Sequence, residues 1–512
     1  MIEKCRKIGS NIIDLIAVLL IGFVFIANLL RTCRVSYDDA EVVSYSTSTS
    51  YVFFVLILLL SVYCYLRITT KIDIESIIKG FSIIYIIAGL YIIFNTTPFI
   101  RADAATVWGT AKNFLDGDFS GLLKENYIGL FPFQLGMVTY DEILQLFTEN
   151  ENILYAANLL EILIINWFGY KITNSLFHND TANRIAVFLE FAFIPQFLFL
   201  MFGYGLIPGF CCFILAVYFC IRIHREWNLK DVICLIGFST LASLIKPNFK
   251  IGIIAIVIVL VLKQCETFKV NYKLCITALL VLLCSVGAFN LMKLTYSSIS
   301  GIKIGDGTPM LAHIAMGTDL DNEVRAPGWF DGYTFSAYSD AHYNTQLATQ
   351  NTRAKIKVNI SESVNDPTRA MSFYWRKILS TWCEPMFQSA WSGPFGEDLV
   401  ATPCLISLYS GKSVEKNVAL FSKANVIIIL VLSLCFILKR RKDYPAARIL
   451  YLYFIGGFIF HLFSETKSQY VYMYIFLMIP IAAYELNQAL KYLRSKKKSS
   501  IIQPKIKDNS HL

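Results

Sequence analysis

The chain has 512 residues, of which 55% are hydrophobic and only 16% are charged. These proportions exclude an ordinary soluble protein, because so much apolar surface could not be kept from water. The formal net charge is +9, but the basic residues cluster at the ends of apolar runs, where they set membrane topology and meet anionic lipid head groups. A role in binding nucleic acid is therefore not indicated.

Apolar runs of ~17–25 residues, the length that crosses a bilayer core, recur along the whole sequence. The strands of a membrane barrel would instead alternate over ~10 residues. The sequence therefore predicts an all-α polytopic membrane protein. We place its transmembrane helices, about twelve, at residues 11–30, 51–68, 77–95, 153–173, 184–203, 206–222, 230–246, 248–263, 273–295, 419–438, 446–463 and 470–490.

The spacing of these runs predicts four parts in the chain. Residues 1–294 form an N-terminal transmembrane bundle, which contains a first long outer loop at 95–152. Residues 295–418 form a small extracytoplasmic domain, and residues 419–495 form the C-terminal transmembrane helices. Residues 496–512 are predicted to be a basic, disordered cytoplasmic tail.

The basic residues also predict the orientation. Lys4, Arg6 and Lys7 precede the first apolar run, and the run from Lys439 to Lys442 lies in a short loop assigned to the same side. Short cytoplasmic loops carry an excess of Lys and Arg, so both termini are predicted to be cytoplasmic. The composition, rich in Ile, Lys and Asn, indicates the plasma membrane of a bacterium.

The first outer loop contains a helical pattern from Ala102 to Leu115, with apolar residues three and four positions apart. It predicts an amphipathic helix that lies along the membrane surface. Asp103 is near the N-terminus of that helix, where the helix dipole favours a negative charge. A carboxylate just beyond a membrane helix is costly unless it is used or paired, so Asp103 is either a catalytic group or a plain helix cap.

The stretch that follows carries a resemblance. "RADAATVW" with Asp103, then "FLDGDFSGL", Tyr127, "FPFQLG" with Gln134, and finally Glu142 resemble the first outer loop of GT-C superfamily glycosyltransferases. Relatives include the dolichyl-phosphate-mannose protein mannosyltransferases and the bacterial aminoarabinose transferases, which take a sugar from a polyprenyl or dolichyl phosphate. The resemblance implies a GT-C-like fold with Asp103 as the catalytic base and the other three residues around the substrate.

Other outer carboxylates compete with Asp103 for this role. Asp38, Asp39 and Glu41 in "YDDAEVV" rank second, because the aromatic context is absent there. Asp118 and Glu142 rank third and are expected to position the loop or the acceptor.

Two lysines are candidates for holding a lipid-linked phosphate. Lys246 in "SLIKPN" lies at the outer end of a predicted helix, where it either snorkels to the interface or meets an anion. "FSETKSQYVYMY" places Glu465, Lys467 and Tyr470 in a short outer loop before the last helix. GT-C members often have an acidic residue followed by Arg-Tyr here. This chain has Gln469 before the tyrosine, so Lys467 is the candidate for the basic role.

The second outer segment contains "HIAMGTD", "APGWFDGY" and "TWCEPMFQSAWSGPFG". Its glycine and aromatic density is typical of a sugar or acceptor cleft and equally of ordinary packed loops. His313 is a candidate for phosphate binding or acid–base chemistry, or is simply structural. Cys383 and Cys404 are either a disulfide or two free thiols.

These features predict the transfer of a sugar from a polyprenyl-phosphate donor to a glycan, lipid or protein acceptor on the outer face. Asp103 would act as base, and Lys246 and Lys467 would hold the phosphate. No Walker, dinucleotide-binding or HExxH motif occurs, so no cofactor is expected and a divalent metal is not supported. The alternatives are a flippase or transporter, which would place charges near the bilayer midplane, and a polymerase or ligase of lipid-linked saccharides.

Overall fold

A computed structural model describes residues 2–38, 40–47, 49–264, 271–394 and 397–502. The described residues form twenty-two α-helices and one antiparallel pair of short strands. The predicted all-α class is therefore confirmed.

The first membrane helices flank a small hairpin. The elements are α1 (Ile2–Leu30), β1 (Thr32–Val35), β2 (Val43–Ser46), α2 (Tyr51–Ile68) and α3 (Ile74–Phe94). In the hairpin Thr32 pairs with Ser46 and Val35 with Val43. The hairpin packs beside Trp329 of the second outer segment, so it belongs to the same end of the molecule as that segment.

The first outer loop forms α4 (Ala102–Leu115), α5 (Tyr127–Leu130) and α6 (Leu135–Gln145). The bounds of α4 are those that the apolar spacing predicts. Its apolar stripe is buried, however, and packs on α6 and its neighbours. The stripe is therefore covered by protein rather than by lipid, which fixes the N-terminus of α4 within the folded structure.

The central helices follow in chain order: α7 (Asn152–Phe177), α8 (Asp180–Phe191), α9 (Ile194–Leu198), α10 (Leu206–Arg225), α11 (Leu229–Ile245), α12 (Lys250–Gln264) and α13 (Tyr272–Ser300). Their starts follow from capping: the side chains of Asn179 and Asn228 accept hydrogen bonds from the backbone amides of Ala182 and Asp231. The break between α11 and α12 follows from Pro247, because a residue before proline avoids the helical region and Lys246 is extended.

The second outer segment forms α14 (Leu311–Gly317), α15 (Tyr333–Ser339), α16 (Thr345–Asn365), α17 (Pro367–Trp382) and α18 (Pro403–Tyr409). The C-terminal helices are α19 (Ser413–Arg440), α20 (Arg448–Phe463), α21 (Tyr472–Phe476) and α22 (Ile479–Ile502). α22 thus continues into the first residues of the predicted basic tail, and residues 503–512 lie outside the described residues.

Ten helices of the described chain are long and apolar enough to cross a membrane, or eleven if the bent pair α8 and α9 is one span. Two of the about twelve predicted runs are not among these ten helices. The run at 184–203 is broken, with α8 and α9 (extended to Met201) meeting at 48°. The helix predicted at 230–246 is α11, whose 17 residues are at the short end of the ~17–25 that span a bilayer.

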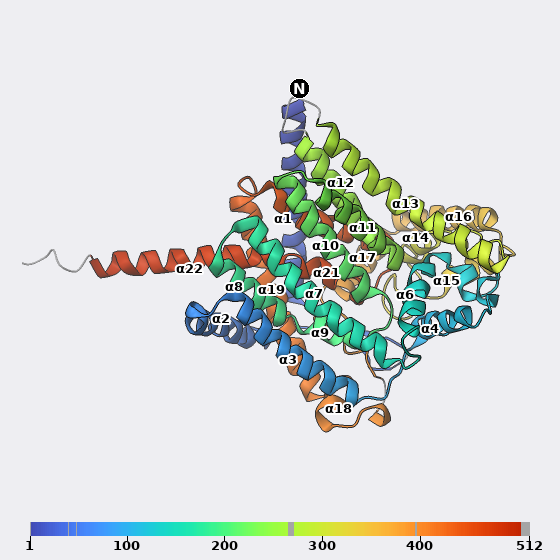
Figure 1. Cartoon of the computed structure of the whole chain (residues 1–512), viewed down its shortest axis with the longest axis horizontal. Coiled ribbons are helices and arrows are strands. Elements are labelled where there is room, and N and C mark those ends of the chain that lie inside the picture. The colour runs from blue at the N-terminus through green and yellow to red at the C-terminus, as the bar shows by residue number, and fades with distance from the viewer. Residues whose placement is uncertain (1, 39, 48, 265–270, 395–396, 503–512) are drawn as a thin grey trace, which may run out of the picture.

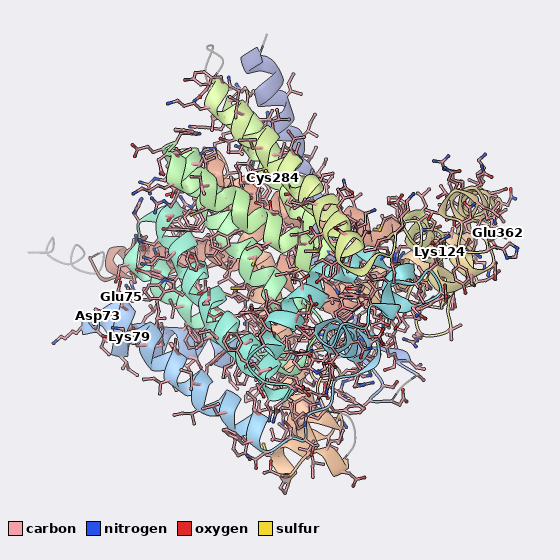
Figure 2. All side chains as sticks on the ribbon, turned by 45° about the vertical axis from the view of Figure 1, so that its right-hand side comes forward. Asp73, Glu75, Lys79, Lys124, Cys284 and Glu362 are labelled. Carbon is pink, nitrogen blue, oxygen red and sulfur yellow. The ribbon has the colours of Figure 1, made fainter. Side chains whose placement is uncertain are left out.

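Helices of the two segments predicted to lie outside gather at one side of the bundle. In Figure 1, α4, α6, α14, α15 and α16 lie together on the right, away from the N-terminus at the top. Figure 2 shows Asp73, Glu75 and Lys79, at the N-terminal end of α3, on the opposite side from Lys124 and Glu362. The loops predicted on opposite membrane faces are thus separated in space.

Cys383 is buried, Cys404 is exposed and both are free thiols, so they form no disulfide.

Candidate active site

A cavity of about 440 Å³ lies where the two outer segments meet the ends of the membrane helices. It is lined by eight of the nine residues that the sequence predicts for the site: Asp103, Tyr127, Gln134, Lys246, His313, Glu465, Lys467 and Tyr470. These residues come from parts of the chain more than 350 positions apart, and the fold brings them to one space.

Asp103 lies in the first turn of α4, at the wall of the cavity. The residue before it, Ala102, has a left-handed backbone with φ of 48°. Such a conformation in a non-glycine residue costs ~1–3 kcal/mol and tends to occur at functional sites. Tyr204 donates a hydrogen bond of 3.4 Å to the Asp103 carboxylate. The hydroxyl of Tyr204 also contacts that of Tyr127 at 2.9 Å and accepts from Gln134.

The Asp103 side chain is exposed to the space inside the cavity, and the protein that encloses this cavity surrounds the carboxylate at a greater distance. Burial raises the pKa of Asp103 above its ordinary value, and the ammonium groups of Lys246 and Lys467 oppose that rise. The sequence-based expectation that the helix dipole keeps this carboxylate ionised is thus incomplete. The surrounding protein makes Asp103 a stronger base than a solvated aspartate.

Lys246 contacts Tyr204, the tyrosine that also donates to Asp103. Its Nζ lies 3.9 Å from the centre of the Tyr204 ring and donates to the Tyr204 carbonyl at 3.4 Å. Burial lowers the pKa of Lys246 to about 8, although the carboxylates of Asp103 and Glu465 oppose the change. The lysine is therefore turned into the protein rather than out toward the membrane interface.

Lys467 lies on another wall, in contact with a carboxylate that the sequence ranks second. Its Nζ donates to both oxygens of Glu41 at 2.7 Å, and the guanidinium of Arg325 bonds the same carboxylate. Gln388 adds a fourth hydrogen bond of 3.1 Å. Glu41 is 1% exposed and has a left-handed φ of 50°. Burial also lowers the pKa of Lys467 to about 8.

His313 and Glu465 form a third group on the wall. His313 Nδ1 lies 3.7 Å from Glu465 Oε2, and the Glu465 amide donates to the His313 carbonyl at 2.7 Å. Burial alone would raise the pKa of Glu465, but His313 and Lys467 lower it below its ordinary value. The buried ammonium of Lys377 donates to the carbonyls of Ser464 and Gly317, which fastens this loop to the end of α14.

The remaining acidic candidates lie elsewhere. Glu142 does not line the cavity, and its carboxylate accepts a hydrogen bond from Tyr296 of α13. Asp38 accepts from Ser36 and the amide of Ala40, as in a turn. Asp118 accepts from the amide of Ser120 at 2.8 Å, as its turn sequence predicts. Asp39 lies outside the described residues.

Sequence reasoning missed several residues of the cavity: Arg101, Tyr204, Arg325 and Trp391. The Arg101 guanidinium lies 4.3 Å from the centre of the Trp391 ring and donates to the Trp391 carbonyl at 2.9 Å. A signal existed for two of these residues. Arg101 is the first residue of the quoted stretch "RADAATVW", and Trp391 lies in the aromatic stretch "TWCEPMFQSAWSGPFG".

The charges around the cavity favour an anion. The lining residues include four basic side chains, from Arg101, Lys246, Arg325 and Lys467, and three acidic ones, from Glu41, Asp103 and Glu465. Within the described ranges, no cluster of three or more His, Cys, Asp or Glu residues is placed to hold a metal ion. The arrangement offers a carboxylate in a cavity beside cations, which suits chemistry on a substrate that carries a phosphate.

The fold and the cavity define a multi-pass membrane protein with its polar site at the ends of its helices. Residues 140–288 match the family described as dolichyl-phosphate-mannose-protein mannosyltransferase, which belongs to the GT-C superfamily. The resemblance to these glycosyltransferases is thereby confirmed for this part of the chain, which includes Tyr204 and Lys246. The match supports a glycosyltransferase activity. No curated protein matches the chain.

Proposed function

We propose that the protein transfers a sugar from a polyprenyl-phosphate donor to an acceptor hydroxyl on the outer face of the membrane. The observation that carries the proposal is the cavity itself, which collects Asp103, Lys246 and Lys467 from three distant segments. A base and two cations are the groups that such a transfer requires. The family match over residues 140–288 supports the same donor class.

In the proposed reaction, the acceptor hydroxyl gives its proton to the Asp103 carboxylate while its oxygen bonds to the anomeric carbon. The bond between that carbon and the phosphate oxygen breaks, and the electron pair leaves with the lipid phosphate. A phosphate leaves without protonation, so no second acid is required, unlike in glycoside hydrolysis. General-base catalysis of this kind contributes typically ~10²–10⁴-fold.

The cations have the complementary role. Lys246 and Lys467 would hold the donor phosphate and stabilise the charge that it gains as it leaves. Both side chains are largely buried, and an anion that meets them there is screened less than at a solvated surface. Arg101 and Arg325 line the same cavity and add to its positive potential.

The experiment that tests the proposal is an assay of purified protein with polyprenyl-phosphate sugars, in which release of the lipid phosphate is measured. Release that depends on the protein supports sugar transfer. Movement of the intact donor between leaflets of a proteoliposome, without release, would instead show a flippase. A polymerase or ligase would release the lipid carrier only with a lipid-linked saccharide as the second substrate.

A further inference from the structure

A second cavity, of about 190 Å³, lies behind the wall of the first. Trp391 lines both cavities, and so forms part of the wall between them. Gln388 lines the second cavity, while its amide nitrogen donates to Glu41 of the first. The other polar side chains around the second cavity are those of Arg34, Tyr37, Glu384 and Glu415. None of these four is needed for the proposed transfer.

The wall between the cavities is held in a costly conformation. Phe387 and Gln388 are consecutive non-glycine residues with left-handed φ values of 52° and 55°. The buried carboxylate of Glu384 fixes them, because it accepts from the amides of Met386 at 2.9 Å and Gln388 at 2.6 Å. Backbone strain of this kind persists where the surrounding structure enforces it, commonly at ligand sites.

Gln388 also has an unsatisfied polar atom. The residue is 2% exposed, and its Oε1 has no hydrogen-bond partner among the described residues. A buried acceptor without a partner costs ~1–3 kcal/mol. A ligand with a hydroxyl group in the second cavity would supply the missing donor.

Charged groups complete the lining. The Glu415 carboxylate, which is buried, forms a 2.9 Å ion pair with Arg34, whose side chain is 38% exposed. The pair presents acceptors and donors in fixed positions at the outer end of α19. Trp391 contributes a flat ring at the side nearest the first cavity.

We propose that the second cavity binds one saccharide unit of the acceptor, so that the acceptor is a carbohydrate. Sugar hydroxyls both donate and accept hydrogen bonds, which matches Glu415, Arg34 and the free oxygen of Gln388. The apolar face of a sugar ring can pack on Trp391. The cavity is far larger than the ~30 Å³ share of one water and smaller than the ~300–1,000 Å³ clefts that take drug-sized ligands. A peptide segment would need a longer groove.

Trp391 and Arg101 connect the second cavity to the segment that carries the proposed base. Arg101 stacks on Trp391 and precedes Asp103 by two residues. In this proposal the saccharide extends past the Trp391 ring, which lines both cavities, and a hydroxyl of its next unit meets the Asp103 carboxylate in the first. This inference rests on the proposed function, because it concerns the acceptor of the same reaction.

The test uses a variant that fills the second cavity. Ala419 is 4% exposed and lines that cavity but not the first, so Ala419→Leu reduces the space for a sugar. Val418→Leu is the matched control, since Val418 is the neighbouring residue on α19 and lines neither cavity. The full-length protein is assayed for transfer to methyl glycosides of disaccharides built from hexoses and N-acetylhexosamines, and for donor hydrolysis without acceptor.

We expect saccharide transfer by Ala419→Leu to fall at least tenfold relative to donor hydrolysis, with the Val418→Leu ratio unchanged. An unchanged ratio in Ala419→Leu would overturn the inference, as would transfer to a serine-containing peptide but to none of the glycosides. If the wild type releases no lipid phosphate at all, the proposed function has failed. The second cavity is then tested by the binding of glycosides, measured as a shift in Tm. Millimolar glycosides should then raise the Tm of wild type and of Val418→Leu but not of Ala419→Leu, and no rise in wild type would refute the site.

Discussion

Lys467 donates hydrogen bonds of 2.7 Å to both carboxylate oxygens of Glu41, a residue 426 positions earlier in the chain. Arg325 bonds the same carboxylate. The cation proposed to hold the donor phosphate is therefore also held by a protein anion. A bound phosphate would have to share Lys467 with Glu41, so we expect this carboxylate to position the lysine and to limit donor affinity.

The first prediction concerns that carboxylate. Glu41→Gln keeps the size of the side chain and removes one negative charge from the cavity wall, so KM for the lipid donor should fall. The free energy of unfolding should also fall, by ~3–5 kcal/mol, because a largely buried lysine loses its partner. Steady-state kinetics and thermal unfolding in detergent measure the two effects. Asp38→Asn, which alters a carboxylate outside the cavity, is the control, and a KM that rises in Glu41→Gln would refute the limiting role.

The second prediction is that Asp103→Asn lowers turnover about 10²-fold or more, because it removes the proposed base and keeps the shape of the side chain. Folding should be little changed, since the carboxylate is reached by solvent in the cavity. Release of lipid phosphate and gel-filtration profiles would be compared with those of Asp118→Asn, whose carboxylate only stabilises a turn. A folded Asp103→Asn protein with turnover within a few-fold of wild type would exclude Asp103 as the base.

The third prediction concerns the cations. Lys246→Met and Lys467→Met should each raise KM for the lipid donor about tenfold or more, the equivalent of ~1.4 kcal/mol of lost phosphate binding. The acceptor KM should change much less. Lys250→Met is the control, because Lys250 starts α12 near Lys246 and does not line the cavity. Unchanged donor dependence in both single variants and in the double variant would exclude the proposed phosphate site.

The fourth prediction is a bell-shaped pH dependence of kcat/KM. The pKa of Asp103 is raised, so the base is lost as the pH falls through that raised value. Burial lowers the pKa of Lys246 to about 8 and that of Lys467 to about 8, so the cations lose their charge as the pH rises through about 8. Asp103→Asn should remove the acid limb and leave the alkaline one. An alkaline limb that stays in place in the Lys246→Met, Lys467→Met double variant would contradict the assignment.

The fifth prediction is the orientation, with both termini cytoplasmic and residues 295–418 outside. Ser339→Cys, in the exposed end of α15, should react with a membrane-impermeant maleimide in intact cells after the exposed Cys404 is changed to serine. Thr70→Cys, in the predicted inner connection between α2 and α3, should react only after lysis. The reverse pattern would invert the topology.

Hydropathy and local spacing by themselves determined much of this protein. The length of each apolar run predicted the membrane helices, because crossing a bilayer is a property of a single segment. The three- and four-residue spacing from Ala102 to Leu115 predicted α4, since helix periodicity is local as well. The bounds of the apolar runs at 230–246 and 248–263 predicted the break at which Lys246 lies. Each of these features depends only on residues that are close together in the sequence, so the sequence alone predicts it.

Only the tertiary structure decided how the site is assembled. The sequence offered Glu41 as one of several outer carboxylates, and nothing near it indicated Lys467 or Arg325 as its partners. It gave no sign that Glu142 turns to Tyr296 instead of the cavity, or that Trp391 separates two cavities. Ion pairs, cavities and the pKa of Asp103 depend on which distant segments pack together. That packing is a property of the whole fold, which no single stretch of this sequence specifies.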